Sequence, residues 1–311
     1  MRQRSSKFSS ASLIATGVLV LLAPRRATAQ ACCAGTGAVT PGRLAVHEDA
    51  LIAVQARASH VYASFDSGGH YGTPPNGSSE QDFEEDVIGS LRLPVIDRAQ
   101  LAVLVPFVET HRSARGKGEA GGGFGDINLS ARYDFLYAVQ RRWVPGIAAL
   151  SGITFPSGRS PESATHALAT DSTGVGAYQE NFGIALEQLF GPFLVTAYGI
   201  VAKRASRTAD RIRSTLGTQW SALVSVAYAL PHDYAMALSA SYSGEGDAEV
   251  EGAKSPGSAR RITTLGLTGV VPVTDHFRLQ GGFSGNPPIP QLGKNQPATV
   301  GLLVTALYAW Y

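Results

Sequence analysis

The chain has 311 residues, of which 44% are hydrophobic and 16% are charged, against about 25% charged in ordinary soluble domains. Five of the 26 basic residues lie in the first 29 positions, which hold no acid, so the rest of the chain carries 21 basic and 24 acidic residues. This balance excludes a basic nucleic-acid-binding surface, and the abundance of apolar residues excludes an intrinsically disordered chain.

Residues 1–29 have the layout of a secretory signal peptide. A basic stretch over 1–7 is followed by an apolar run over 11–24 and by the small-residue site Ala27-Thr28-Ala29. The apolar run is shorter than the roughly 20 residues that a membrane-spanning helix needs. We therefore expect export, with cleavage after Ala29.

Twelve later segments carry the period-two alternation of β-strands. In 127–135, for example, Leu129 and Tyr133 share one face, whereas Arg132 and Asp134 share the other. The twelve predicted strands are 50–63, 84–93, 99–109, 127–135, 143–155, 181–190, 193–202, 216–228, 234–243, 260–271, 277–283 and 299–311. Pro106 and Pro145 fall inside two of them, where a ladder N–H group would be lost, and they mark bulges or strand ends.

The connections between these segments alternate in length. Long polar and glycine-rich connections, such as 64–80 and 157–174, take turns with short ones, such as 94–98 and 191–192. This alternation is typical of outer-membrane barrels, and a β-sandwich gives no reason for it. The predicted fold class is all-β, a transmembrane antiparallel up-and-down barrel of about 12 strands (range 10–14) over residues 50–311.

Residues 30–49 precede the first predicted strand from the periplasmic side. The segment is rich in small residues and is long enough to fold into or across the periplasmic mouth as a plug, or else it is a disordered tail. Cys32 and Cys33 are the only cysteines. A disulfide between them, metal binding, lipid attachment at Cys32 and an inert pair all stay open. His47-Glu48-Asp49 is expected to be a polar lead-in, with metal ligation as the alternative.

Two motifs are similar to those of one outer-membrane family. Residues 123–133, Gly-Phe-Gly-Asp-Ile-Asn-Leu-Ser-Ala-Arg-Tyr, and residues 155–158, Phe-Pro-Ser-Gly, resemble motifs of the family named for the MetA pathway of phenol degradation. The resemblance implies an outer-membrane transport protein and names no solute. From the residues themselves, Gly123 and Gly125 suit a tight start to a strand, and Asp126 suits a structural role in the loop.

Polar side chains on the alternate faces of the strands are the candidate functional residues, because in a barrel they line the lumen. The candidates are Glu84, Asp86, Arg92, Asn128, Arg132, Asp134, Glu187, Gln219 and Arg278. They either line a water-filled pore and set its selectivity, or pair across a sealed lumen.

The sequence offers little for catalysis. His111 and Ser113 raise the alternative of an outer-membrane hydrolase, but they begin a charged stretch that we expect to be a solvated loop. We predict no catalytic residues, no metal site and no cofactor. The Gly-rich stretch before Asp126 opens a strand, so it does not form a nucleotide site.

The predicted function is that of a monomeric outer-membrane channel for small solutes, including small hydrophobic or aromatic compounds. Its expected partners are membrane lipid and lipopolysaccharide, the outer-membrane assembly machinery and the solute, with no nucleic acid. The first alternative is a sealed barrel with a structural or surface-binding role, and the second is the hydrolase.

Overall fold

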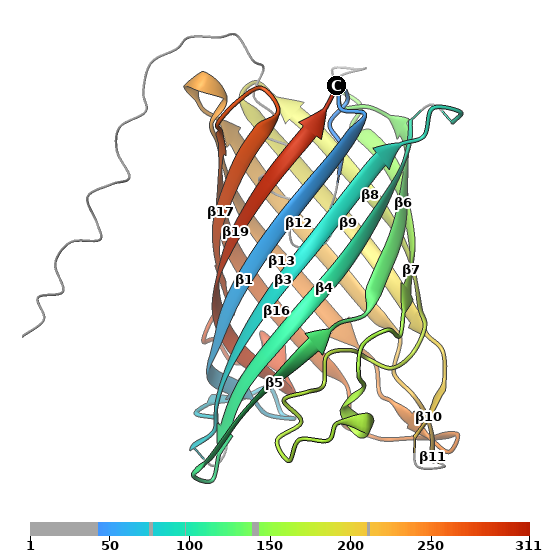
Figure 1. The fold of residues 1–311 in the computed structure, drawn as a ribbon, viewed down its shortest axis with the longest axis vertical. Helices are drawn as coiled ribbons and strands as arrows, with labels where there is room; N and C mark the ends of the chain where they lie inside the picture. The colour runs from blue at the N-terminus through green and yellow to red at the C-terminus, as the bar shows by residue number, and fades with distance from the viewer. Residues whose placement is uncertain (1–42, 75–76, 97, 139–142, 210–211) are drawn as a thin grey trace, which may run out of the picture.

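The alternating segments form the wall of a closed antiparallel barrel in the computed structural model (Figure 1), which describes residues 43–311 except 75–76, 97, 139–142 and 210–211. The twelve wall strands are β1 (Ala50–Phe65), β3 (Ser79–Arg92), β4 (Ala99–Ala114), β6 (Ile127–Leu136), β7 (Gly146–Phe155), β8 (Gln179–Phe190), β9 (Phe193–Arg204), β12 (Gln219–Ala229), β13 (Ala235–Glu245), β16 (Arg260–Pro272), β17 (Phe277–Gly285) and β19 (Gln296–Trp310). They follow one another around the wall in chain order, and the pairing of β1 with β19 closes it. The predicted fold class and strand number are confirmed.

The period-two pattern sorts side chains between the two faces of this wall. In β6, Leu129, Tyr133 and Phe135 are 39–55% exposed, whereas Asp134 between them is 7% exposed. In β12, Val224 and Val226 are exposed while Ser225 is buried. The outer face is therefore apolar and the inner face polar. This distribution of polar and apolar residues is the inverse of that in a water-soluble protein and is typical of a membrane barrel.

Short strands lie at the end of the barrel that carries the long connections. β2 (Tyr71–Gly72), β5 (Lys117–Phe124) and β18 (Gly293–Lys294) extend the wall sheet, while β10 (Arg207–Ala209), β11 (Ile212–Thr215), β14 (Glu249–Val250) and β15 (Ala253–Lys254) form a small second sheet. Figure 1 shows β5, β10 and β11 at the end opposite the C terminus. One 3₁₀ turn, Pro161–Ser163, lies in the long connection after β7, and another, Pro231–Asp233, lies in the short connection between β12 and β13. Over the described part of the chain, no helix is long and apolar enough to cross a membrane.

The connection expected as a solvated loop from residue 111 is instead a β-hairpin. β4 continues to Ala114, and β5 returns from Lys117 in register with it. Arg115 and Gly116 form the two-residue turn with φ angles of 52° and 76°. Positive φ at both positions is the geometry that matches the twist of a tight hairpin. The prediction of a loop was wrong because charges and glycines hid this pairing.

The two prolines that conflicted with strand formation lie where no ladder bond is lost. Pro145 immediately precedes β7. Pro106 lies in β4 at the point where its neighbour changes from β6 to β5, and its carbonyl accepts a hydrogen bond from Gly125 N at 2.8 Å. A side chain at Gly125 would come within 2.8 Å of the Pro106 ring. Gly125 therefore has to be glycine for the wall to close over this break.

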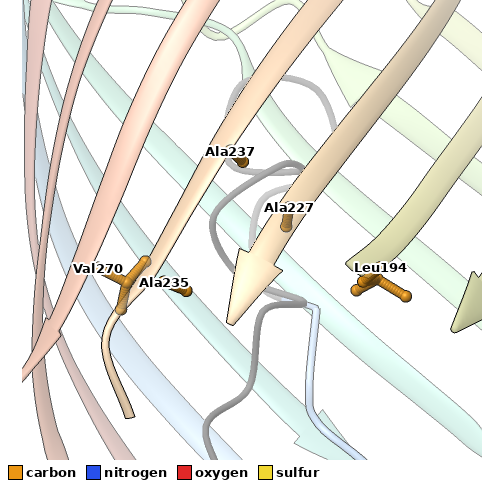
Figure 2. Close-up of a cluster of buried hydrophobic side chains, with 5 residues drawn as sticks. All are labelled: Leu194, Ala227, Ala235, Ala237 and Val270. Atoms are coloured by element: carbon orange, nitrogen blue, oxygen red, sulfur yellow. The ribbon is translucent and has the colours of Figure 1, made fainter. Parts of the chain in front are cut away.

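Small apolar side chains gather on the inner wall near the short-turn end. Figure 2 shows one such cluster, which comes from β9, β12, β13 and β16. Its members are Leu194, Ala227, Ala235, Ala237 and Val270. A second cluster packs Leu44 against Leu51 and Ala53 near the start of β1, against Ile88 toward the end of β3 and against Ala309 of β19. The inner wall at the short-turn end is thus lined with buried apolar side chains.

Candidate functional site

The chain before β1 turns into the barrel at the short-turn end. We call residues 43–49 the latch segment. Leu44, Ala45 and Glu48 in it are 4%, 3% and 0% exposed. The Ala45 N–H group donates to Glu48 Oε2 at 2.8 Å, and Leu44 N–H donates to Gln100 Oε1 at 2.8 Å. The latch segment is therefore a half-buried turn bound to the wall. Cys32, Cys33 and the rest of 30–42 lie outside the described residues.

Two predicted lumen residues hold this turn. Arg92 donates from Nη2 to the carbonyl of Ala45 at 2.6 Å and to that of Glu48 at 2.9 Å. Arg278 forms an ion pair with Glu48, whose carboxylate is fully buried. Because Arg92 lies on β3 and Arg278 on β17, the latch segment is fixed to the wall on both sides of β1.

The latch segment also reaches the far side of the barrel. Arg43 forms an ion pair with Glu187 of β8. β8 is five steps from β1 along the order β1-β3-β4-β6-β7-β8, nearly half of the circumference. A segment that is anchored beside β1 and ends on β8 crosses the lumen.

Three further predicted residues meet at this far contact. Arg132 donates to Asp134 Oδ1 at 2.7 Å and to Glu187 Oε1 at 3.0 Å. With Arg43 on the other oxygen of Glu187, two guanidinium groups and two carboxylates form a chain of ion pairs. Their side chains are only 5–10% exposed, so these charges balance one another with little water around them.

A second polar cluster lies on the inner faces of β1 and β3, toward the long-loop end. Arg57 donates to Glu84 at 2.7 Å and to Asp86 at 2.9 Å, and Gln55 Nε2 donates to Asp86 at 2.7 Å. Asp86 is fully buried, whereas the Glu84 side chain is 31% exposed. This wall of the lumen combines a buried carboxylate with an accessible one.

The other two predicted residues, Asn128 and Gln219, lie farther around the wall. Asn128 donates to Thr154 Oγ1 at 2.9 Å. Gln219 accepts a hydrogen bond from Arg204 at 2.7 Å, and Arg204 in turn forms an ion pair with Glu245 at 2.7 Å. The nine candidates therefore divide among separate clusters instead of converging on one point, and whether they select solutes stays a prediction.

A cavity of about 270 Å³ lies between these clusters inside the barrel. Arg43, Gln100 and Arg132 line it on the latch side, and amide groups of Asn181 and Gln219 line it as well. Its aliphatic lining includes Leu104, Leu150 and Ile200, and the small lining residues Ala102, Ser130, Gly152 and Ala202 leave the space unfilled. An engineered apolar cavity of about 150 Å³ accommodates benzene, so this space suffices for a ring-sized solute with polar groups.

The two motifs of the family resemblance meet in space. Asp126 accepts hydrogen bonds from Gly158 N at 2.9 Å and Val175 N at 2.6 Å. Ser157 Oγ donates to the Gly125 carbonyl at 2.8 Å and accepts from Ile127 N at 2.9 Å. The expected structural role of Asp126 is confirmed: it fixes both ends of the long connection after β7 to the start of β6.

That long connection is itself a folded unit. Asp171, 5% exposed, accepts hydrogen bonds from the Thr165 hydroxyl at 2.7 Å and the Thr165 N–H group at 2.9 Å, and pairs with Arg159. These donors, the Thr165 hydroxyl foremost, hold the pKa of Asp171 well below its usual range. Glu119 of β5 accepts from Leu168 N at 2.7 Å. The connection thus packs on the β4–β5 hairpin as a cap.

The residues considered for chemistry do not assemble a reactive site. The His111 ring pairs with Glu109 at 2.6 Å and Ser113 Oγ with Ser79 Oγ at 2.8 Å, so His111 does not serve Ser113 as a base. His47 stacks on Tyr311 with ring centroids 5.1 Å apart, while Glu48 turns inward to Arg278. Among the described residues, no group of three or more His, Cys, Asp or Glu side chains is arranged to hold a metal ion.

Sequence reasoning missed several residues of these clusters. Arg57 lies in an alanine-rich segment whose two faces do not differ in polarity. It is nevertheless an odd-numbered residue of β1, like the buried Leu51, Ala53 and Gln55, and therefore lies on the same face. Arg43 and Glu48 precede the first strand, where no periodicity exists to place a side chain. The alternation along β1 could have identified Arg57, whereas the positions of Arg43 and Glu48 depend on tertiary contacts.

Comparisons with known proteins support the fold. No family model and no curated protein matches the chain, so the resemblance to the phenol-degradation family still rests on the two motifs. An outer-membrane channel from Pseudomonas putida F1 is similar in structure, with a TM-score of 0.72 and 15% identity over 86% of this chain and 97% of that one. The transport unit of the autotransporter AIDA-I from Escherichia coli gives 0.49 and 7% over 90% and 96%, and the KdgM porin gives 0.47 and 8% over 83% and 99%. The chain has the fold of bacterial outer-membrane β-barrels.

Proposed function

We propose that the chain is an outer-membrane channel that passes small solutes through the barrel, and that the latch segment controls the periplasmic mouth. The observation that carries the proposal is the lumenal cavity, which lies directly beside Arg43 of the latch segment. The outer-membrane location is supported by the apolar outer wall and by a fold otherwise found in outer-membrane barrels.

The mixed lining of the cavity favours solutes that have both an apolar body and hydrogen-bonding groups. Leu104, Leu150 and Ile200 offer dispersion contacts, and the amides of Asn181 and Gln219 offer donors and acceptors. The two cavity-lining arginines, Arg43 and Arg132, are matched by carboxylates, so an uncharged solute meets no unbalanced charge at this point.

The same contacts that place the latch segment also obstruct the pathway. A solute leaving the cavity toward the short-turn end has to pass the ion pair of Arg43 with Glu187 and the turn held by Arg92. Passage therefore requires the latch segment to move. The sealed barrel remains the second candidate, because a latch segment that never moves leaves only a structural role.

Swelling of proteoliposomes in solutions of small uncharged solutes of increasing size tests the proposal. We compare the wild type with Arg43→Ala combined with Glu48→Ala, which removes the ion pairs of the latch segment with Glu187 and Arg278. Val46→Ala is the control in the same segment, because its side chain is 54% exposed. Passage by the wild type that becomes faster in the double variant supports the channel. Absence of swelling in both, with the barrel still assembled, supports the sealed barrel.

A further inference from the structure

The inner face of β3 carries carboxylates at four alternate positions, Glu80, Asp82, Glu84 and Asp86. Each is matched differently by the neighbouring strands. Arg112 donates to both oxygens of Glu80, at 2.7 and 2.9 Å. Arg57 is shared between Glu84 and Asp86. Asp82 accepts a hydrogen bond from the uncharged Thr110 hydroxyl at 2.8 Å.

Between positions 80 and 86, two guanidinium groups thus face four carboxylates, and this part of the β3 wall keeps a negative excess, whereas Arg92 lies nearer the short-turn end and holds the latch segment. The excess shows at the atomic level in two places. Within the described residues, no cation lies within ion-pair distance of Asp82, and the Oδ1 atom of the fully buried Asp86 lacks a hydrogen-bond partner. Glu84, with 31% of its side chain exposed, brings this negative charge into contact with the lumen.

The wall across the lumen has the opposite sign. Arg204 of β9 and Arg260 of β16 share one carboxylate, Glu245 of β13, at 2.7 and 3.1 Å. β9 and β13 are each five steps from β3 around the twelve-stranded barrel, so this positive excess faces the β3 wall.

A low-dielectric wall lined with one sign of charge focuses the field and concentrates counterions beside it. Rings and rows of carboxylates make pores cation-selective by this mechanism. Only the accessible, incompletely matched groups contribute, because Glu80 is neutralised by a bidentate arginine. Asp82 and Glu84 are the residues that meet both conditions.

On the basis of the proposed channel function, we propose that the lumen prefers cations to anions, that small cationic solutes pass along the β3 wall, and that Asp82 and Glu84 set this preference. The cluster of Arg204, Arg260 and Glu245 repels cations toward the β3 wall. This preference applies to charged solutes, whose sign the fold alone does not determine.

The reversal potential of the full chain in a planar bilayer under a KCl gradient tests this inference. We expect the wild type to reverse toward the K⁺ equilibrium potential, and Asp82→Asn combined with Glu84→Gln to lower the K⁺/Cl⁻ permeability ratio by about threefold or more. Glu85→Gln is the matched control, because Glu85 is the neighbouring residue on β3 and is exposed on the outer face. Glu84→Asp, which keeps the charge, should retain the preference.

Each outcome decides the matter. An anion-preferring wild type, or a double variant with an unchanged ratio, overturns the inference while the measured conductance still supports a channel. A wild type without conductance overturns the channel and the inference together. If the double variant fails to assemble, Asp82→Asn alone decides, because this carboxylate has no ion pair to lose: an unchanged ratio there overturns the inference.

Discussion

The ion pairs of Glu187 predict a large and specific loss of stability in Glu187→Gln. The substitution removes the charge that both Arg132 and Arg43 contact and keeps the shape of the side chain. Exposed ion pairs contribute about 0–1 kcal/mol, whereas removal of one partner from a buried pair costs about 3–5 kcal/mol. Because the three side chains are 5–10% exposed, the buried regime applies. Arg132 keeps Asp134, which places the expected loss near the lower end, at about 3 kcal/mol.

The free energy of unfolding in phospholipid, followed by tryptophan fluorescence during guanidinium titration, measures this loss. Glu180→Gln is the matched control on the same strand, since Glu180 is exposed and should change stability by less than about 0.5 kcal/mol. Combining Glu187→Gln with Arg43→Gln should lose less than the sum of the two single losses, because the pair is already broken. A loss below about 1 kcal/mol with no coupling would refute the reasoning and show that water fills this part of the lumen.

Three further outcomes follow from other contacts. Leu129→Arg places a charge on the outer wall, where Leu129 is 41% exposed. It should lower the free energy of unfolding by about 2–4 kcal/mol if this position lies at the membrane midplane. An equal loss in Arg132→Ala would show that the inner and outer faces are alike. Asp126→Ala removes two hydrogen bonds from backbone N–H groups and costs about 1–3 kcal/mol locally. It should expose residues 156–178 to protease while the barrel stays intact. A connection that stays protected would contradict the role of Asp126. The folded state lowers the pKa of Asp171, so the stabilisation by its carboxylate is present above the usual Asp pKa range and is lost only as the pH falls below that range. The connection over 156–178 should therefore remain protease-resistant at about pH 4. Asp171→Asn should make the connection protease-sensitive at neutral pH, and resistance in that variant would exclude the carboxylate as its anchor.

The period-two pattern and the alternating loop lengths were sufficient to predict the barrel. Leu129 and Asp134 illustrate why. One side of the wall suits lipid and the other side is polar, so the polarity of each residue indicates which face of the wall it occupies. The same logic failed at the β4–β5 hairpin. There both faces of the hairpin carry polar residues, with Thr110 and Arg112 on one and Glu109 and His111 on the other, so polarity no longer distinguishes the faces.

The polar clusters were predictable only as sets of inward residues. Parity places Glu84, Arg132 and Glu187 on the inner face, but which charges pair depends on strand register and on the latch segment. Arg43 illustrates the limit, because its contact with Glu187 joins positions 144 residues apart. No local pattern before β1 encodes that contact.

The central claim is that a pathway runs through the barrel and is controlled by the latch segment. Single-channel conductance in planar bilayers tests it most directly, with the wild type, Val46→Ala and the combined variant Arg43→Ala, Glu48→Ala compared at equal assembly on heat-modifiability gels. We expect small openings in the wild type and in Val46→Ala, and larger or longer openings once the two latch ion pairs are removed. Conductance that is identical in all three proteins, or absent from all three, would contradict it.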